Sequence, residues 1–352
     1  MKTGKIKHIG IGLLAVLATS CQHSEELLIP TEGYISFNSE VASRGELVTE
    51  MTGKDFGVMG YEYNGDWNTV KVQATPDLFY AQTIGWDNAQ KLHTYDPLKP
   101  WIPGKRYTFF GYYPTAGVTL SEADVEGVPY LTYTLPNSPA QMKDVMTAVL
   151  YDTDNSASNS VGLTFQHRLV AMNVQARNFN TPHNGFPVYI KLTDVKIKYT
   201  NLKYSSVILP MDTSLPITRE EANNKTKEYT ILANGNIRIE PSMGEAEAIE
   251  VSANQNPPTT LILIPQEGTD EANDYLKGTV TFSFKYVDEN GADLNIANAA
   301  QAGTRSLDFD LGKSIVAGRK YALQMNFSRT SVTIAIVESG EWTDQDIDIE
   351  FE

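Results

Sequence analysis

The sequence predicts an all-β protein with two domains, each built as a β-sandwich or a β-barrel. After residue 31, short segments in which apolar and polar residues alternate follow one another, and Gly, Pro, Asn and Asp separate them. Helical periodicity is scarce over the same region. The chain has 352 residues, 41% of them hydrophobic, which is enough for one large core or two ordinary cores, and we expect two domains. The period of two, the turn residues and the length together give the fold class.

The clearest strand candidates are rich in Tyr, Phe and β-branched residues, which suit half-buried sheet faces. In chain order they are VMGYEYNG (58–65), YTFFGYY (107–113), YLTYTL (130–135), VGLTFQH (161–167), VYIKLTD (188–194), TLILIP (260–265), GTVTFSFKYV (278–287), YALQMNFS (321–328) and SVTIAIV (331–337). Within residues 189–199 the apolar positions change parity between Leu192 and Val195. This change predicts a β-bulge near Thr193 and Asp194.

An internal similarity favours duplication of one domain. IPGKRYTFFGYYP (102–114) and VAGRKYALQMNFS (316–328) share a glycine, two basic residues, a tyrosine and an alternating strand. A turn followed by a strand is common, so chance similarity stays open. The domain boundary is expected in the polar turn NFNTPHNGFP (178–187), which gives domains at 32–180 and 181–352. The polar segment 213–229 is expected to be an exposed excursion of the second domain.

The N-terminus has the pattern of an export signal. Basic residues at Lys2, Lys5 and Lys7 precede an apolar run over 9–18, which is shorter than the ~20 residues of a membrane span. The signal is expected to cover 1–20, because residues 17–21, LATSC, resemble a bacterial lipobox that ends at Cys21. Cys21 would then carry lipid, and 21–31 would form a tether. An ordinary signal peptide with an incidental cysteine is the alternative.

Composition limits the possible partners and chemistry. The chain has 43 acidic and 28 basic residues, and its net charge of -15 disfavours nucleic acid as a partner. Cys21 is the only cysteine, so a disulfide within the chain is excluded. His93, His167 and His183 lack the spacing of metal ligands, and we interpret His167 as a packed residue at a strand bend. The sequence therefore predicts no catalytic residue, no metal site and no cofactor.

Two acidic segments are candidates for special roles. YDTDNSAS (151–158) has Asp152, Asp154 and Ser156 at the spacing of a calcium loop, but it lacks the glycine and the distant glutamate of an EF-hand, which favours a solvated loop. WTDQDIDIEFE (342–352) alternates acids with apolar residues and predicts an amphipathic strand. A simple closing strand of the second domain is an equal alternative for that segment.

Several motifs together resemble the fimbrillin family, the type V pilins and related surface lipoproteins of Gram-negative anaerobes. They are the lipobox, YISFNSEVASRG (34–45), the W-x-P-G-K-x-Y-x-F-F-x-Y-Y-P block (101–114), DVMTA (144–148), LTFQHRL (163–169) and the late Gly-x-x-Tyr strand. The resemblance implies two tandem transthyretin-like β-sandwich domains and export to the outer surface as a lipoprotein. It also implies that an arginine-specific protease removes the first strand, and that a strand of a neighbouring subunit fills the groove.

Carried onto this sequence, the resemblance places the cleavage between Arg44 and Gly45. The removable strand is then 34–41, and it includes Tyr34, Ile35 and Phe37. A donor strand is expected within 331–352, where two segments have an apolar face of period two. Their apolar residues are Val332, Ile334 and Ile336 in the first and Ile347, Ile349 and Phe351 in the second.

The leading hypothesis is a fimbrial subunit, stalk or tip, without catalytic activity. Its expected partners are other pilin subunits bound by β-strand addition, an arginine-specific protease, and the outer membrane through lipid on Cys21. The expected location is the cell outer membrane and the fimbrium. The alternative is a monomeric surface lipoprotein that binds glycan or host protein through Trp67, Trp86, Trp101 or Trp342, although these tryptophans are interpreted first as core residues. A secreted hydrolase on a β-sandwich is a remote third possibility.

Overall fold

The computed structural model describes residues 33–41, 51–156, 158–241, 248–251, 260–266, 275–296 and 299–341. Within these ranges the chain is almost entirely β, with one short helix, α1 (Trp67–Val70), and one 3₁₀ turn, η1 (Pro139–Gln141). In chain order the strands are β1 (Ser36–Val41), β2 (Phe56–Tyr63), β3 (Phe79–Asp87), β4 (Leu92–Thr94), β5 (Arg106–Tyr113), β6 (Thr119–Leu120), β7 (Tyr130–Thr134), β8 (Met146–Thr153), β9 (Ser160–His167), β10 (Val170–Asn178), β11 (Tyr189–Tyr199), β12 (Tyr204–Pro210), β13 (Thr218–Glu221), β14 (Lys227–Leu232), β15 (Ile237–Ile239), β16 (Ile249–Glu250), β17 (Leu261–Leu263), β18 (Lys277–Val287), β19 (Gly303–Asp310), β20 (Arg319–Phe327) and β21 (Val332–Glu341). The predicted all-β class is confirmed, and each of the nine strand candidates overlaps a strand.

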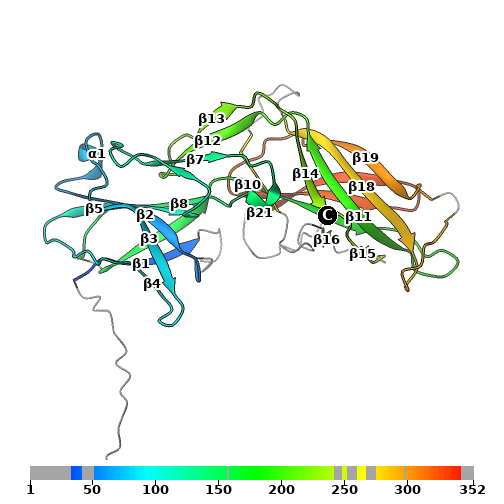
Figure 1. Cartoon of the computed structure of the whole chain (residues 1–352), viewed down its shortest axis with the longest axis horizontal. Helices are drawn as coiled ribbons and strands as arrows, with labels where there is room; N and C mark the ends of the chain where they lie inside the picture. Colours follow the sequence, from blue (N-terminus) through cyan, green and yellow to red (C-terminus); the bar gives the residue numbers. More distant parts are fainter. Residues whose placement is uncertain are drawn as a thin grey trace, which may run out of the picture.

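The first half of the chain forms a closed barrel with the strand order β1-β4-β3-β2-β5-β8-β9 (Figure 1). Its interior is lined by aromatic and aliphatic side chains, including Phe37, Phe56, Phe109 and Phe165. The alternation along β9 is complete, since Val161, Leu163 and Phe165 are buried and the residues between them are not. The set of β9 side chains that face the interior therefore follows directly from the period of two in the sequence.

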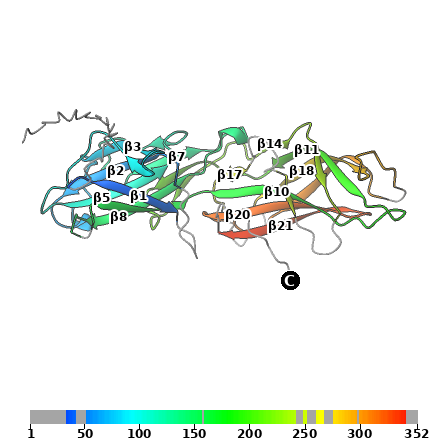
Figure 2. The ribbon, with the colours of Figure 1, turned by 90° about the horizontal axis from the view of Figure 1, so that it is seen from below.

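The second half is a sandwich of two sheets. One sheet has the order β16-β10-β20-β21, with β17 also paired to β10, and the other has the order β14-β11-β18-β19, with β15 also paired to β11 (Figure 2). The two sheets meet through rings such as Phe327 on β20, whose centroid lies 5.6 Å from that of Phe282 and 5.1 Å from that of Phe284 on β18. The predicted bulge is confirmed, because the register between β11 and β18 shifts between Leu192 and Asp194.

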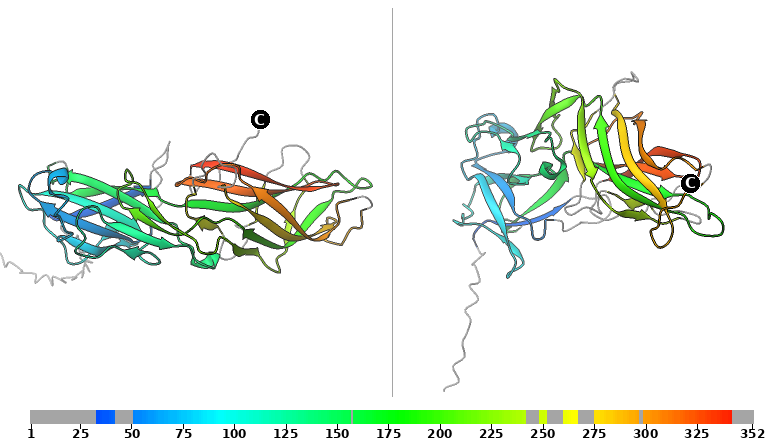
Figure 3. Two further views of the ribbon diagram at one scale, coloured as in Figure 1. Left: turned by 90° about the horizontal axis from the view of Figure 1, so that it is seen from above. Right: turned by 45° about the vertical axis from the view of Figure 1, so that its right-hand side comes forward.

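A third sheet, β13-β12-β7-β6, joins strands from both halves of the chain. β12 follows β10 and β11 in sequence, yet it pairs antiparallel with β7. One continuous core extends from residues of the first half, such as Tyr61 and Tyr133, into the second-half sandwich. The molecule is accordingly a single elongated body in which the two halves lie end to end (Figure 3).

The predicted division of the chain at residue 180, the number of domains and their transthyretin-like type stay predictions. The strand pairing adds two facts to them. β10, which ends at Asn178, lies in the second-half sheet beside β20. The segment 213–229, expected to be an exposed excursion, includes β13, whose side chains are mostly exposed and which pairs with β12 at the edge of the joining sheet.

The two similar segments adopt the same local structure. The Tyr107 hydroxyl accepts a hydrogen bond from the backbone N–H of Ile102 at 2.8 Å, and the Tyr321 hydroxyl accepts one from that of Val316 at 3.2 Å. The glycine inside each turn has a left-handed backbone, with φ of 81° in the first and 74° in the second. Each turn is therefore closed by a tyrosine near the start of the next strand.

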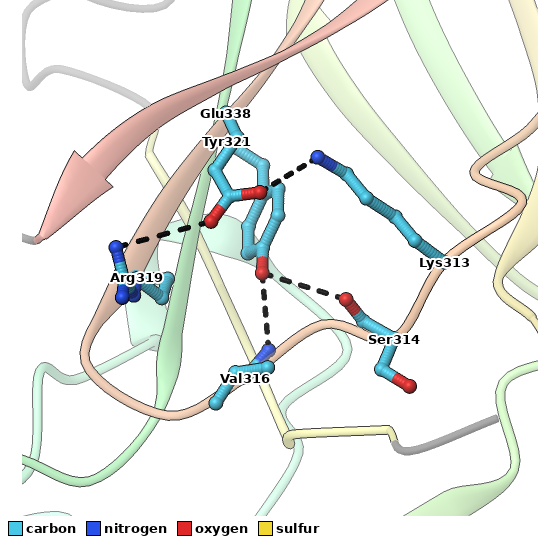
Figure 4. A network of polar contacts seen from close by, with 6 residues as sticks. All are labelled: Lys313, Ser314, Val316, Arg319, Tyr321 and Glu338. Atoms are coloured by element: carbon cyan, nitrogen blue, oxygen red, sulfur yellow. Dashed lines mark hydrogen bonds and ion pairs between the residues drawn. The ribbon is translucent and has the colours of Figure 1, made fainter.

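A glutamate on a neighbouring strand completes each of these turns. Glu62 lies opposite Tyr107 in the β2–β5 register, and Glu338 lies opposite Tyr321 in the β20–β21 register. Figure 4 shows Glu338 between Lys313 and Arg319, with nitrogen–oxygen distances of 2.7 and 3.9 Å. In the first half, Lys105 lies 3.7 Å from Glu62. The similarity between 102–114 and 316–328 is thus one of three-dimensional structure as well as sequence.

Candidate functional site: the first strand and its groove

The first strand, β1, is fixed by backbone hydrogen bonds along one edge of the barrel. Its residues from Ser36 to Val41 pair in parallel with β9 from Ser160 to Phe165. Just before the strand, the Ile35 N–H donates to the Lys99 carbonyl oxygen at 2.9 Å, and the Trp101 N–H donates to the Gly33 carbonyl oxygen at 3.0 Å. β1 therefore covers both the edge of β9 and the segment that leads into the Ile102 turn.

The other edge of β1 has a much shorter ladder, although the residues just before β1 are bridged to the segment after β4 through Tyr34 and Pro100. Its register with β4 consists of one antiparallel pair, Phe37 opposite His93, among the residues that the structure describes. The barrel closes at this point with far fewer bonds than at the β1–β9 seam. A strand held mainly along one edge can leave without disrupting the pairing on its other side.

Side chains of β1 fill the barrel interior. Ile35 is 1% exposed and Phe37 is 5% exposed, whereas Tyr34 points outward and is 37% exposed. The Phe37 ring packs edge-on against four aromatic rings, with centroid distances of 6.4 Å to Phe56, 6.0 Å to Phe79, 5.7 Å to Tyr95 and 5.6 Å to Phe109. Burial of each apolar side chain contributes about 1.5–3 kcal/mol. Phe37 of β1 and Ile35 just before it therefore both contribute to the apolar core of the barrel.

Two titratable side chains on or near β4 contact the first strand. The Tyr95 hydroxyl donates to the Ile35 carbonyl oxygen at 2.8 Å, and burial raises the pKa of Tyr95. The His93 ring lies 4.9 Å from both Phe56 and Trp86, and its Nε2 is 3.1 Å from the Lys54 carbonyl oxygen. Burial lowers the pKa of His93 below its usual 6.5, so the ring is neutral at pH 7.

The candidate donor residues Val332, Ile334 and Ile336 lie on β21, at the edge of the second-half sheet. They stand opposite Phe327, Met325 and Leu323 of β20 and share the face of those core residues. In this structure β21 thus completes the chain's own sandwich. The use of these side chains as a donor strand stays a prediction.

The remaining predicted site residues lie outside the residues that the structure describes. They are Cys21, Arg44, Gly45, Ile347, Ile349, Phe351 and, among the tryptophans, Trp342. Lipidation at Cys21 and cleavage after Arg44 therefore stay predictions.

The comparisons with known proteins agree with this architecture. The model of a family described as fimbrillin-like matches residues 49–342. The chain belongs to the fimbrillin-like family. Crystal structures show the same fold for a fimbrial protein from Bacteroides vulgatus ATCC 8482, at 19% identity and a TM-score of 0.63 over 87% of this chain and 99% of that one. A candidate cell adhesion protein from Bacteroides uniformis ATCC 8492 has 15% identity and a TM-score of 0.50 over 89% of this chain and 100% of that one. No curated protein matches the chain.

Within the fimbrillin-like fold of this chain, two tryptophans are core residues. Trp67 is 3% exposed and Trp101 is 6% exposed, and Trp101 donates its indole N–H to the Asn159 carbonyl oxygen at 3.2 Å. Trp86 is only partly buried and lies on the β3–β4 hairpin, where it packs against His93. Of the three tryptophans that the structure describes, Trp86 is thus the one available for contacts with a ligand.

Asp152 of the acidic segment lies on β8 and not in a loop, and both Asp152 and His167 make structural contacts in this fold. Asp152 has a positive φ of 49°, and its Oδ1 accepts hydrogen bonds from the Trp67 backbone N–H at 2.7 Å and the Tyr63 hydroxyl at 3.0 Å. His167 is buried at the end of β9, with its Nδ1 2.9 Å from Asp144 Oδ1. No group of three or more metal-ligating side chains occurs in the described part of the chain. Among the same residues, no helix is long and apolar enough to span a membrane.

Sequence reasoning missed several residues that build this site. Tyr95, His93 and Lys99 contact or oppose β1, but they lie far from it in sequence and match no motif. The alternating pattern of LHTY (92–95) was the one available signal, and it is too short to predict a strand.

Proposed function

We propose that this protein is a fimbrial subunit that is exported as a lipoprotein and assembled by strand exchange after cleavage at Arg44. The observation that carries the proposal is the placement of residues 35–41: Ile35 and Phe37 are buried inside the barrel, and the ladder of β1 with β4 consists of one pair among the described residues. The segment 42–50, which contains Arg44, directly follows β1 in the chain. A cut there separates the strand from the rest of the fold.

The groove left by β1 would be unstable when empty. Backbone groups on β9 from Ser160 to Phe165 would lose their partners, and the rings around Phe37 would face water. An exposed apolar edge of this kind binds another strand, because backbone hydrogen bonds supply affinity and alternate side chains fill the pockets. A strand from a second copy of the chain can supply both the backbone bonds and the side chains, provided that it has an apolar residue at every second position.

Two segments of the neighbouring copy qualify as the donor. Val332, Ile334 and Ile336 fill the core of their own sandwich, so donating them would require β21 to leave β20. The segment with Ile347, Ile349 and Phe351 follows β21 and offers the same spacing. A stalk subunit would donate one of these segments, whereas a tip subunit would accept a strand and donate none.

The remaining parts of the proposal concern location and contact. We propose that Cys21 is lipidated, that the protein is located at the outer membrane and the cell surface, and that the assembled fimbrium mediates adhesion. The support is the lipobox at residues 17–21, membership of the fimbrillin-like family, and the fold shared with the fimbrial protein from Bacteroides vulgatus. A structural subunit of this kind requires neither a cofactor nor a catalytic residue.

The test is the N-terminus and the multimeric state of protein taken from the cell surface. Mass spectrometry should place the mature N-terminus at Gly45, and a ladder of multimers should accompany it. Arg44→Ala should abolish both, and Arg329→Ala, at an exposed turn, should leave both unchanged. Retention of Arg44 in wild-type multimers, or normal assembly by Arg44→Ala, would contradict the proposal.

A second candidate function is ligand binding by a monomer. It is favoured by β21, which completes its own sheet, and by Trp86 and Leu92 on the β3–β4 hairpin, where Leu92 is 38% exposed. A partly exposed indole suits the apolar face of a sugar. Glycan-array binding that is lost in Trp86→Ala, together with a single monomeric species after proteolysis, would support this candidate over the fimbrial subunit.

A further inference from the structure

A lysine, an asparagine and a glutamate lie together on one face of the β16-β10-β20 sheet. Lys320 on β20 is opposite Ala171 of β10, two residues before Asn173. Glu250 on β16 is opposite Gln175, two residues after Asn173. Since residues two apart on a strand share a face, the three side chains project from the same face of three adjacent strands.

The carboxylate of Glu250 bridges the other two side chains. Its Oε1 accepts a hydrogen bond from Asn173 Nδ2 at 2.5 Å. Its Oε2 lies 3.8 Å from Lys320 Nζ. One carboxylate therefore contacts both a primary amine and the nitrogen of a carboxamide.

The carboxamide is buried and incompletely satisfied. Asn173 is 1% exposed, and its neighbours Ala171 and Ala322 are 0% and 1% exposed. Asn173 Oδ1 has no hydrogen-bond partner among the residues that the structure describes. A buried amide oxygen without a hydrogen-bond donor lowers the stability of the fold, because its desolvation is not compensated. The unsatisfied Oδ1 of Asn173 therefore requires an explanation.

We propose that Lys320 and Asn173 form an amide bond between their side chains, with Glu250 as the proton relay. Lys320 Nζ attacks Asn173 Cγ, a bond forms between these atoms, and the bond from Cγ to Nδ2 breaks. The attacking ammonium gives up two protons and the departing nitrogen gains two, so it leaves as ammonium ion. The products are one amide and one ammonium, and the reaction needs no oxidant, reductant or further reactant.

The positions of Lys320 and Asn173 relative to Glu250 fit the proton transfers. Glu250 Oε2 faces the nitrogen that must lose protons, and Oε1 faces the nitrogen that must gain them. Once protonated by Lys320, the carboxyl can donate to Asn173 Oδ1 and polarise the carbonyl, which explains why that oxygen has no other donor. The apolar surroundings of Ala171 and Ala322 limit competition from water.

The bond would join β10 covalently to β20. β10 is the strand through which the chain enters the second half, and its pairing with β20 runs in parallel from Ala171 to Asn178. A covalent link at its beginning closes a long loop, which stabilises the fold against unfolding. The proposal concerns the second half alone and does not depend on the fimbrial assignment.

Tryptic peptide mapping of the purified full-length protein tests the proposal. The bond predicts a branched peptide that joins residues 169–177 to 320–329, lighter by one ammonia than the sum of its parts, with cleavage after Lys320 blocked. Lys320→Arg and Glu250→Gln should each yield the unlinked peptide 169–177. Lys285→Arg, which alters an exposed lysine paired with Asp293, should keep the branched peptide.

The contradicting results are equally specific. Separate linear peptides 169–177 and 321–329 in the folded wild-type protein, with no branched species, would overturn the proposal. If the branched peptide is also found in Glu250→Gln, the bond between Lys320 and Asn173 is supported, but the role of Glu250 as proton relay is contradicted. Because the wild-type measurement is decisive alone, a variant that fails to fold does not affect the test.

Discussion

The hydroxyl of Tyr95 donates a 2.8 Å hydrogen bond to the carbonyl oxygen of Ile35. The same hydroxyl accepts a bond from the Lys99 N–H at 3.2 Å. It thereby joins the start of β1 to the segment on its β4 side, where the β1–β4 ladder has a single pair. On the β4 side, the attachment of β1 thus depends on this side chain as well as on the ladder.

Tyr95→Phe should weaken the attachment of β1. The substitution removes both bonds and keeps the ring against Phe37 and Phe79, so the free energy of unfolding should fall by about 1–3 kcal/mol. Urea denaturation of the uncut protein measures the change. Tyr80→Phe is the control, since Tyr80 bonds to the Ser121 carbonyl oxygen from a 43% exposed position and should cost less than about 0.5 kcal/mol. Equal losses in the two variants would contradict the role given to Tyr95.

Phe37→Ala should be among the most destabilising substitutions in the barrel. It leaves a cavity bordered by Phe56, Phe79 and Phe109, and such truncations cost about 3–5 kcal/mol. Tyr34 lies three residues before Phe37 and is 37% exposed, so Tyr34→Ala should cost far less. Denaturation midpoints of the two variants give the comparison, and a loss below about 1 kcal/mol for Phe37→Ala would mean that β1 contributes little to the core.

The stability of the barrel should depend on pH through His93. The pKa of His93 is lower in the folded protein than its unfolded value of 6.5, so the unfolded chain binds more protons. The stability from this group is fully present above pH 6.5 and is lost as the pH falls below it. Asp55, whose charge favours the protonated ring, reduces this effect without reversing it.

Urea midpoints at pH 7.5 and 5.5 test this dependence. The wild type should be less stable at pH 5.5, and His93→Gln should lose most of the difference between the two values. His183→Gln changes a histidine in the 178–187 turn and should keep the wild-type difference. An unchanged pH dependence in His93→Gln would assign the effect to other groups.

Arg168 should couple the two halves of the molecule. It is 5% exposed at the crossing between β9 and β10, and it donates to Thr147 Oγ1 at 2.8 Å and to the Pro210 carbonyl oxygen at 2.7 Å. Burial lowers its pKa to about 10, and the charge of Asp212 opposes that shift. Arg168→Leu leaves these groups unpaired and should cost about 3–5 kcal/mol, with a second unfolding transition as the halves separate. Arg106→Leu, at an exposed arginine, should retain one transition.

Much of the fold follows from local patterns in the sequence. The alternation in VGLTFQH predicts β9, and the change of parity between Leu192 and Val195 predicts the bulge in β11. These features depend on the two-residue period of a strand, which any stretch of sequence carries by itself. The inward orientation of Ile35 and Phe37 is an example of the same rule at the candidate site.

The pairing between distant strands could not be predicted in this way. Nothing in the composition of β12 indicates that it pairs with β7, and nothing in β1 specifies a parallel partner in β9. Such choices depend on how whole faces pack, and similar strands compete for each edge. The contacts of Tyr95 with Ile35 and of Glu338 with Lys313 follow from these pairings, so they were also invisible in the sequence.

Native mass spectrometry before and after arginine-specific cleavage tests the central claim that β1 is a removable strand. The probe is a synthetic peptide of residues 342–352, with a control peptide in which Ile347 and Ile349 are replaced by Ser. The account predicts that uncut protein binds neither peptide, and that cut protein loses the residues up to Arg44 and binds one copy of the native peptide. Cut protein that keeps residues 33–44 in place in the presence of excess peptide, or binds both peptides equally, would contradict it.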